Sequence, residues 1–214
     1  MPAAAVLAPM RHIALAALAT LALAGAALPS EAHAQVRTLL EMRQDRVVLQ
    51  QWDLSCAAAA LATILNHQHG DPVTERQIAL TLIQRPEYIA DPELVRRRQG
   101  FSLLDLKRYV DDRGYEGTGL GRLELSHLEE RAPIMVPIDT YGYNHFVVFR
   151  GRHGNRVMLA DPAFGNRTMT VERFMRAWID FPGLGHVGFV VERRDGRRPP
   201  NRLAPSPREF MMLR

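Results

Sequence analysis

The spacing of apolar residues changes its period about halfway along the chain. In the first part, apolar residues recur at helical spacing. This pattern predicts helices over residues 53–67, 74–84, 101–114 and, more briefly, 125–130. From residue 132 onward, short runs rich in β-branched residues alternate with turn signals. They predict strands over 132–139, 145–151, 156–160 and 185–192, with a helix over 170–178. Helices followed by an antiparallel sheet indicate an α+β fold.

Capping residues mark the ends of several predicted helices. A capping box opens at Thr74, Ser102 stands in an N-cap position, and Gly114 follows the helix that begins there. Either Asp53 or Ser55 can cap the first helix.

Other segments are less regular. Residues 46–50 ("RVVLQ") form a short β-prone run, and residues 85–100, with two prolines and several arginines, predict an irregular connection. The link 152–155 between two predicted strands is a candidate hairpin turn.

The N-terminal segment has the three parts of a secretory signal peptide. Arg11 precedes the uncharged run 13–27, and a small-x-small site follows at 32–34. The alternative is a membrane anchor, but the run is shorter than the ~20 residues that a spanning helix needs. We expect cleavage after Ala34 and export to the periplasm or medium, with no integral membrane segment left in the mature chain.

The remaining chain divides into a domain over 35–192 and a basic tail over 193–214. The formal net charge is +4, and Lys107 is the only lysine. Arginine and proline dominate 192–208, which predicts a disordered or loosely docked tail. The tail is either solvated or binds an anionic surface, and the sequence leaves both interpretations open. Basic and aromatic residues are not interleaved, so no nucleic-acid partner is expected.

Cys56 is the only cysteine and stands at the start of a predicted helix. An unpaired thiol in an exported protein suggests a reactive group, because disulfides form and persist in oxidising compartments. A helix N-terminus also favours the thiolate. The alternative is a buried core thiol.

A candidate base and its partner lie in the strand region. His145 begins one strand of the predicted hairpin, and Asp161 ends the other. If the hairpin forms, the two are cross-strand neighbours, and the carboxylate can fix the tautomer of the imidazole.

These motifs together resemble the C39 peptidases, papain-like enzymes that trim double-glycine leaders. The shared features are Gln50 six residues before Cys56, "HFVV" at 145–148 and "DPAFG" at 161–165, and the resemblance covers roughly residues 46–192. Members often have Asp-Cys-Gly at the nucleophile, whereas this chain has Ser-Cys-Ala over 55–57. A signal peptide without a transporter is similar to exported stand-alone members, some of which accompany fibre or amyloid secretion.

The resemblance implies a role for each residue of the site. Cys56 would be the nucleophile, His145 the general base, Asp161 its orienting partner, and Gln50 an oxyanion donor together with the Cys56 backbone N–H. Strand alternation places Gln50 and Gln51 on opposite faces, and the six-residue spacing favours Gln50.

The implied substrate is a peptide or protein cut after small residues of the Gly-Gly or Gly-Ala type, with secretion-system components as possible partners. Aromatic side chains next to the site would narrow its channel: Trp52, Tyr141, Tyr143 and Phe164. No cofactor is expected, and no metal either, because the His67–His69 pair lacks further ligands nearby. Another amide acyl transfer on the same triad and a non-proteolytic peptide-binding module remain alternatives.

Overall fold

The computed structural model describes residues 37–213 of the chain. The predicted signal peptide and its cleavage site lie outside those residues. No helix within 37–213 is long and apolar enough to cross a membrane.

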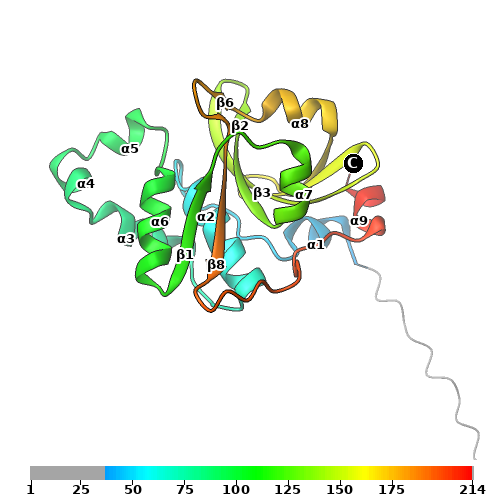
Figure 1. Ribbon diagram of the computed structural model, residues 1–214, viewed down its shortest axis with the longest axis horizontal. Coiled ribbons are helices and arrows are strands. Elements are labelled where there is room, and N and C mark those ends of the chain that lie inside the picture. The colour runs from blue at the N-terminus through cyan, green and yellow to red at the C-terminus, as the bar shows by residue number, and fades with distance from the viewer. Residues whose placement is uncertain (1–36, 214) are drawn as a thin grey trace, which may run out of the picture. The chain divides into compact units, whose positions relative to one another are not determined.

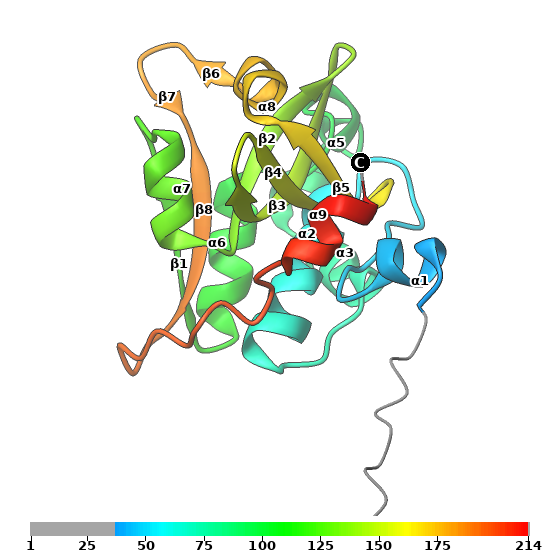
Figure 2. The same ribbon diagram turned by 90° about the vertical axis from the view of Figure 1, so that its right-hand side faces the viewer.

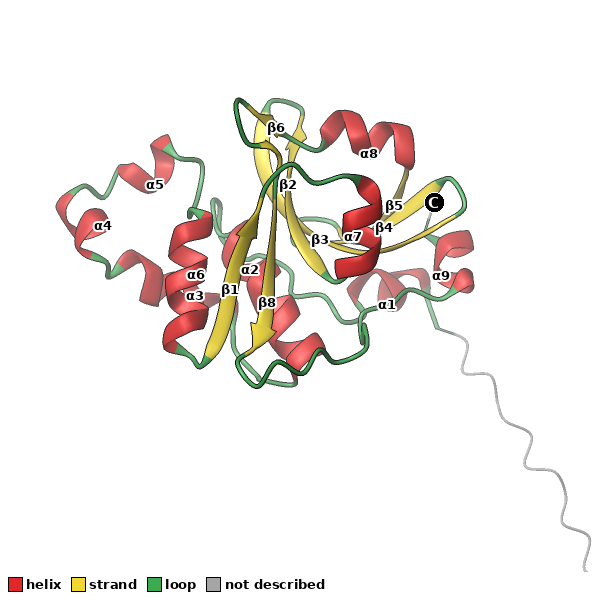
Figure 3. Ribbon diagram, viewed as in Figure 1, coloured by secondary structure: helices red, strands yellow, loops and turns green. Residues whose placement is uncertain are grey.

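The described residues form an α+β fold, as predicted, with helices on both faces of a sheet (Figures 1 and 3). The helices are α1 (Leu39–Gln44), α2 (Cys56–Thr63), the π-helix η1 (Ile64–His69), α3 (Glu75–Ile83), α4 (Pro86–Ala90), α5 (Leu94–Arg97), α6 (Leu103–Asp112), α7 (Leu125–Arg131), α8 (Val171–Ala177) and α9 (Pro207–Met212). The strands are β1 (Tyr115–Leu120), β2 (Ile134–Thr140), β3 (Tyr143–His153), β4 (Arg156–Asp161), β5 (Gly165–Thr170), β6 (Asp180–Phe181), β7 (Gly185–His186) and β8 (Gly188–Arg193).

Six strands make one antiparallel sheet in the order β1-β8-β2-β3-β4-β5. The predicted hairpin over residues 145–160 is its centre, where β3 and β4 pair with His153 opposite Arg156. Ile138 of β2 pairs with His145 at the beginning of β3. The start of β3 and the end of β4 therefore lie at the same end of the sheet.

Each face of the sheet has its own apolar core. On one face, the alanine-rich helix α2 packs with α3 and α6 against residues such as Met135 and Val148. On the other face, α7 and α8 pack around Phe174 and Trp178 (Figure 2). Small side chains let α2 lie close to the strands, which fixes its N-terminus, and Cys56 with it, against the sheet.

The predicted helices are present, and their caps explain their boundaries. Capping boxes form at Thr74 and Ser102, each hydroxyl accepting a backbone N–H of the first turn. Ser55 occupies the N-cap position of α2, but its side chain makes no capping bond. The predicted helix over 53–67 therefore begins at Cys56, and η1 continues it to His69.

Several irregular segments differ from the prediction. Residues 47–50 are not a strand, because they pair with no strand and bond instead to single groups such as the Thr63 hydroxyl. The connection over 85–100 contains the short helices α4 and α5. Strands β1 and β5 form where the sequence pattern indicated none.

The expectation of a disordered or loosely docked tail is wrong for its last part. Leu203, Phe210 and Leu213 are buried, and α9 packs against Met42 of α1. Each such side chain contributes roughly 1.5–3 kcal/mol by leaving water. The apolar residues are too widely spaced among prolines and arginines to give a recognisable period.

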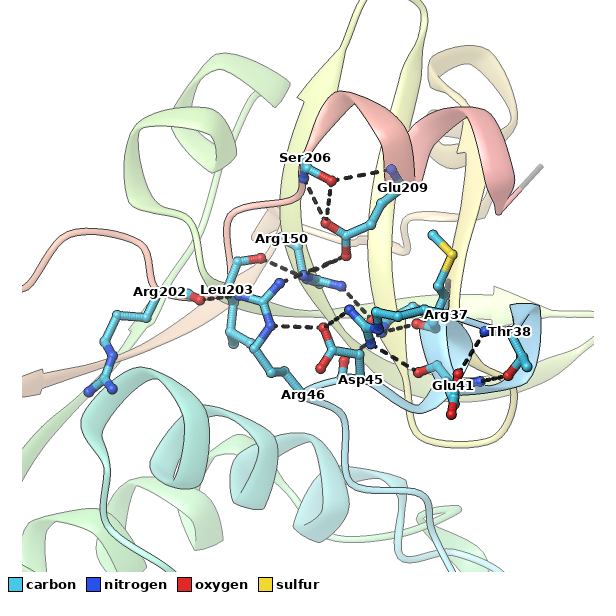
Figure 4. A network of polar contacts seen from close by, with 12 residues as sticks. Arg37, Thr38, Glu41, Asp45, Arg46, Arg150, Arg202, Leu203, Ser206 and Glu209 are labelled. Atoms are coloured by element: carbon cyan, nitrogen blue, oxygen red, sulfur yellow. Dashed lines mark hydrogen bonds and ion pairs between the residues drawn. The ribbon is translucent and has the colours of Figure 1, made fainter. Parts of the chain in front are cut away.

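A buried polar network also holds the tail in place (Figure 4). Arg150 of β3 is fully buried and donates to the Leu203 carbonyl at 2.7 Å, to Asn166 Oδ1 at 2.7 Å and to Glu209 Oε1 at 3.1 Å. Asn166 in turn donates to the Met42 carbonyl at 3.0 Å. The network thus connects α1, the sheet and α9.

Candidate active site

Cys56 is the first residue of α2 and is only 2% exposed. The turn before it is tight, with Leu54 in the left-handed region at φ 68°, a conformation that is costly for a residue with a side chain. The Ser55 hydroxyl donates to the Trp52 carbonyl at 2.6 Å and closes this turn. The sulfur is therefore held at a helix N-terminus by a constrained loop.

Glu75 supports the same loop from the neighbouring helix. Its buried carboxylate accepts the Gln51 N–H at 3.0 Å and also lies in close contact with the Ser55 hydroxyl oxygen. No pattern in the sequence marks Glu75 as part of a site, because the helix dipole alone makes acidic residues common in the first turn of a helix.

The predicted contact between His145 and Asp161 is present. His145 Nε2 lies 2.7 Å from Asp161 Oδ1, and the two side chains are 5% and 0% exposed. Cys56 lies close enough to the same imidazole to be one of the groups that raise its pKa. The three side chains thus form a chain from sulfur to imidazole to carboxylate.

The charges of this chain favour a protonated imidazole. Burial lowers the pKa of His145, but the hydrogen bonds to Asp161 and Cys56 outweigh it and raise the pKa to about 9. Burial likewise raises the pKa of Asp161, yet the His145 hydrogen bond and the nearby Arg167 bring it below its ordinary value. At neutral pH the imidazolium therefore faces the Asp161 carboxylate, which it stabilises as an anion.

Asp161 has further partners that fix its orientation. Oδ1 also accepts the Ala163 N–H at 2.9 Å, and Arg167 Nε donates to Oδ2 at 2.7 Å. Arg167 was not predicted, although it follows Asp161 by six residues. Its role depends on strand β5, which the sequence pattern did not indicate.

Gln50 lies between the two loops of the site. Its backbone N–H donates to the Pro162 carbonyl at 2.8 Å, next to Asp161, and its Nε2 donates to the Trp52 carbonyl at 3.2 Å. The buried Oε1 atom has no hydrogen-bond partner within residues 37–213. Gln51 is exposed and contacts the loop through its backbone. Of the two glutamines, Gln50 is the more buried, because it is half-buried whereas Gln51 is exposed.

The four predicted channel aromatics do not form one wall. Trp52 lines an apolar trough beside the nucleophile loop, whereas Tyr141 and Phe164 line a separate pocket beside Asp161. Tyr143 is the first residue of β3, the strand that carries His145. Burial raises the pKa of Tyr143, and the charges of Cys56 and Asp53 add to this effect.

A short segment connects the two sides of the site. Gln99 Oε1 accepts the N–H of Asn144, next to His145, at 3.2 Å. A Cβ on the following Gly100, at φ +129°, would lie 3.1 Å from the carbonyl oxygen of Leu54. Gln99 and Gly100 therefore contact both the nucleophile loop and the strand of His145. The sequence did not indicate this role, because these residues are far from both segments along the chain.

Other histidines have structural contacts. His69 Nε2 contacts the Val191 carbonyl at 3.1 Å, and His186 stacks on Trp178 with ring centroids 4.5 Å apart. No group of three potential metal-ligating side chains occurs within residues 37–213.

Comparison with known proteins gives a consistent result. The sequence profile of the peptidase C39 family matches residues 44–181. A probable functional amyloid protease, FapD of Pseudomonas aeruginosa, is 40% identical over 147 residues, which are 68% of this chain and 62% of that protein. This chain therefore spans less than two thirds of that relative's length.

Two solved structures are similar in fold. The peptidase domain of Streptococcus ComA, a bifunctional ABC transporter, has a TM-score of 0.54 at 17% identity, covering 69% of this chain and 98% of that domain. A double glycine motif protease from an AMS/PCAT transporter, in complex with its leader peptide, has a TM-score of 0.53 at 23% identity, covering 69% and 90%.

Proposed function

Because the chain belongs to the peptidase C39 family, we propose that it is a cysteine peptidase that cuts a peptide bond through a Cys56 thioester. The observation that carries the proposal is the buried His145–Asp161 contact at 2.7 Å, together with Cys56 at the start of α2 acting on the same imidazole. Sulfur, imidazole and carboxylate in this order are the groups that acyl transfer by a thiol requires.

The chemistry proceeds in two halves. The Cys56 thiolate attacks the carbonyl carbon of the scissile bond, and the His145 imidazolium gives its proton to the leaving amine as the C–N bond breaks. The neutral imidazole then takes a proton from water, and the resulting hydroxide attacks the thioester and releases the acid and the thiolate. Asp161 stabilises the imidazolium and holds its tautomer throughout.

Gln50 is the proposed donor to the oxyanion. Its Nε2 would leave the Trp52 carbonyl, 3.2 Å away, and turn to the developing negative charge. The Cys56 N–H, which is free at the first turn of a helix, supplies the second donor. Fixed donors of this kind contribute most where water is excluded, and the buried site supports that condition.

The proposed substrate is an exported peptide or protein cut after small residues such as Gly-Gly or Gly-Ala. An apolar trough of about 1200 Å³ runs beside the nucleophile loop and includes Leu49, Trp52, Leu80 and Ile83 in its lining. Such a surface suits a peptide with apolar side chains. Tyr143, two residues before His145 on β3, would limit the size of the residue before the cut.

We further propose that the protein acts outside the cytoplasm in a fibre or amyloid secretion system. The predicted signal peptide and the relative described as a probable functional amyloid protease support this placement. Mass spectrometry of the protein recovered from the periplasm or medium should find Gln35 as the first residue. An intact N-terminus in the membrane fraction would contradict export.

The activity is tested with peptides that carry Gly, Ala, Leu or Phe at the two positions before the cut. We expect cleavage of the Gly and Ala peptides, none of the Leu and Phe peptides, and loss of cleavage in Cys56→Ala, His145→Ala and Asp161→Asn. His145 and Asp161 are both buried, so circular dichroism must show that each variant is folded. Equal cleavage of the Leu peptide would contradict the specificity, and cleavage by Cys56→Ala would contradict the mechanism.

A further inference from the structure

A second pocket, rich in arginine, lies beside the triad. It has a volume of about 650 Å³, and most of its lining residues belong to β2, β5 and helix α8 or lie next to them. Its lining includes four arginines and a single acidic residue: Arg43, Arg167, Arg173, Arg176 and Asp139. Of these arginines, only Arg167 contacts a residue of the triad, so the proposed peptidase mechanism leaves the other three without a role.

Two of the four arginines have no carboxylate partner within residues 37–213. Arg167 binds Asp161, and Arg176 pairs with Glu172 on α8. Arg173 reaches only the Tyr141 hydroxyl, at 3.5 Å, and Arg43 has no ion pair among the described residues. Neighbouring guanidinium groups repel one another, so an anion from outside the chain would balance this pocket.

The pocket adjoins the imidazole side of the active site. One of its lining residues, Ile138, is the register partner of His145, and another, Arg167, contacts Asp161 Oδ2 at 2.6 Å. A polypeptide that crosses Cys56 in extended form spans ~3.3 Å per residue. Residues a few positions from the scissile bond would therefore reach the pocket.

The rim of the pocket suits a peptide better than a small ion. Tyr141 is 92% exposed and Phe164 is 58% exposed, and the Arg167 guanidinium lies over the Phe164 ring at 5.3 Å from its centroid. Aromatic faces at the entrance can contact the body of a polypeptide, while guanidinium forks bind carboxylates in a bidentate manner.

We propose that this pocket binds acidic side chains of the substrate close to the bond that is cut. The proposal rests on the proposed peptidase function for its substrate. It makes Arg43 and Arg173 specificity-determining residues, since neither is committed to an internal carboxylate.

The test measures binding separately from cleavage. Fluorescence anisotropy on the Cys56→Ala protein compares two peptides with blocked termini and a Gly-Gly core, one flanked by Glu and one by Gln. We expect the Glu peptide to bind about tenfold more tightly at low salt. The difference should shrink as ionic strength rises.

The matched variants are two double charge reversals in the Cys56→Ala background. Arg43→Glu with Arg173→Glu should abolish the preference for Glu. Arg96→Glu with Arg108→Glu, the same change in net charge at exposed positions of helices α5 and α6, should keep it. Milder Arg→Gln changes at residues 43 and 173 serve as a second pair if the first does not fold.

Equal binding of the two peptides would overturn the proposal, as would an equal effect of both double variants. A Gln peptide with a free C-terminus that binds as tightly as the blocked Glu peptide would overturn the assignment to side chains. Tight binding of the Glu peptide without cleavage by the unmodified enzyme would contradict the peptidase function and leave the pocket supported.

Discussion

Arg167 holds the far oxygen of Asp161: its Nε and Nη2 lie 2.7 and 2.6 Å from Oδ2. Oδ1 of the same carboxylate contacts His145 Nε2. The carboxylate is thus fixed from both sides. Burying its charge would cost much free energy if it had one partner, but both His145 and Arg167 compensate it. Arg167 is accordingly a positioning residue, which acts on the imidazole through Asp161.

Arg167→Gln should lower kcat by roughly ten- to a hundredfold, the value of a hydrogen bond to a charged group. Without the guanidinium, the pKa of Asp161 should rise from its lowered position. The acid limb of the pH profile should therefore move to higher pH. Steady-state kinetics across pH measure both effects, and Arg152→Gln, which removes a surface ion pair on β3, is the control. An unchanged acid limb would show that Arg167 only stabilises the fold.

The imidazole should make the stability depend on pH. The pKa of His145 is raised from 6.5 to about 9 in the folded protein, so protonation favours the native state. This contribution is fully present below pH 6.5 and disappears as the pH rises through about 9. The Asp161 contribution, from a lowered pKa, is present above pH 3.8 and is lost as the pH falls below that value.

Urea unfolding at several pH values tests this dependence. The free energy of unfolding of the unmodified protein relative to His145→Gln should be constant from about pH 4 to 6.5 and should decrease toward pH 10. Gln51→Ala, which removes no titratable group, should show no such trend. A difference that grows with pH would contradict the protonated imidazole.

The two neighbouring glutamines should differ in their effect on activity. Gln50→Ala should lower turnover by about 10²–10³, the cost of removing one oxyanion donor. Gln51→Ala should have little effect, because the exposed Gln51 side chain leaves the backbone bond to Glu75 intact. Kinetics of the two variants with one Gly-Gly peptide provide the comparison. Equal losses would assign the effect to the loop and not to the amide.

The docked C-terminal helix should be important for stability. Glu209→Ala leaves the fully buried Arg150 guanidinium without its carboxylate, and breaking a buried ion pair costs about 3–5 kcal/mol. Glu172→Ala, which removes an exposed pair on α8, should cost about 0–1 kcal/mol. Chemical denaturation measures both values. A loss at Glu209 no larger than that at Glu172 would contradict a structural role for the network.

The sequence predicted those parts of the molecule that local rules determine. The helices that open at Thr74 and Ser102 carry their own capping boxes, and the hairpin that joins His145 to Asp161 follows from two short apolar runs and a turn. Arg167 and Glu75 acquire their roles from elements that meet in space, so neither had a local signal.

Strand β1 escaped prediction for a physical reason. Its sequence, "YEGTGL", has two glycines, which weaken strand propensity. Gly117 is required there because a Cβ would lie 2.6 Å from Val110 Cγ2 and 2.8 Å from Phe189 Cζ. Close packing of α6 on the sheet therefore explains the glycine that made β1 hard to predict from sequence.

The docked tail was hard to predict for a related reason. The burial of Arg150 and α9 depends on contacts between residues that are far apart in the sequence.

The central claim is that Cys56 forms a covalent acyl intermediate. The most direct measurement mixes the enzyme with excess Gly-Gly peptide, quenches with acid within the first turnover, and records the intact mass. A thioester on Cys56 predicts a species heavier by the N-terminal fragment of the peptide, located on Cys56 by digestion and released by hydroxylamine. Product formation without that adduct, or an adduct on another residue, would contradict it.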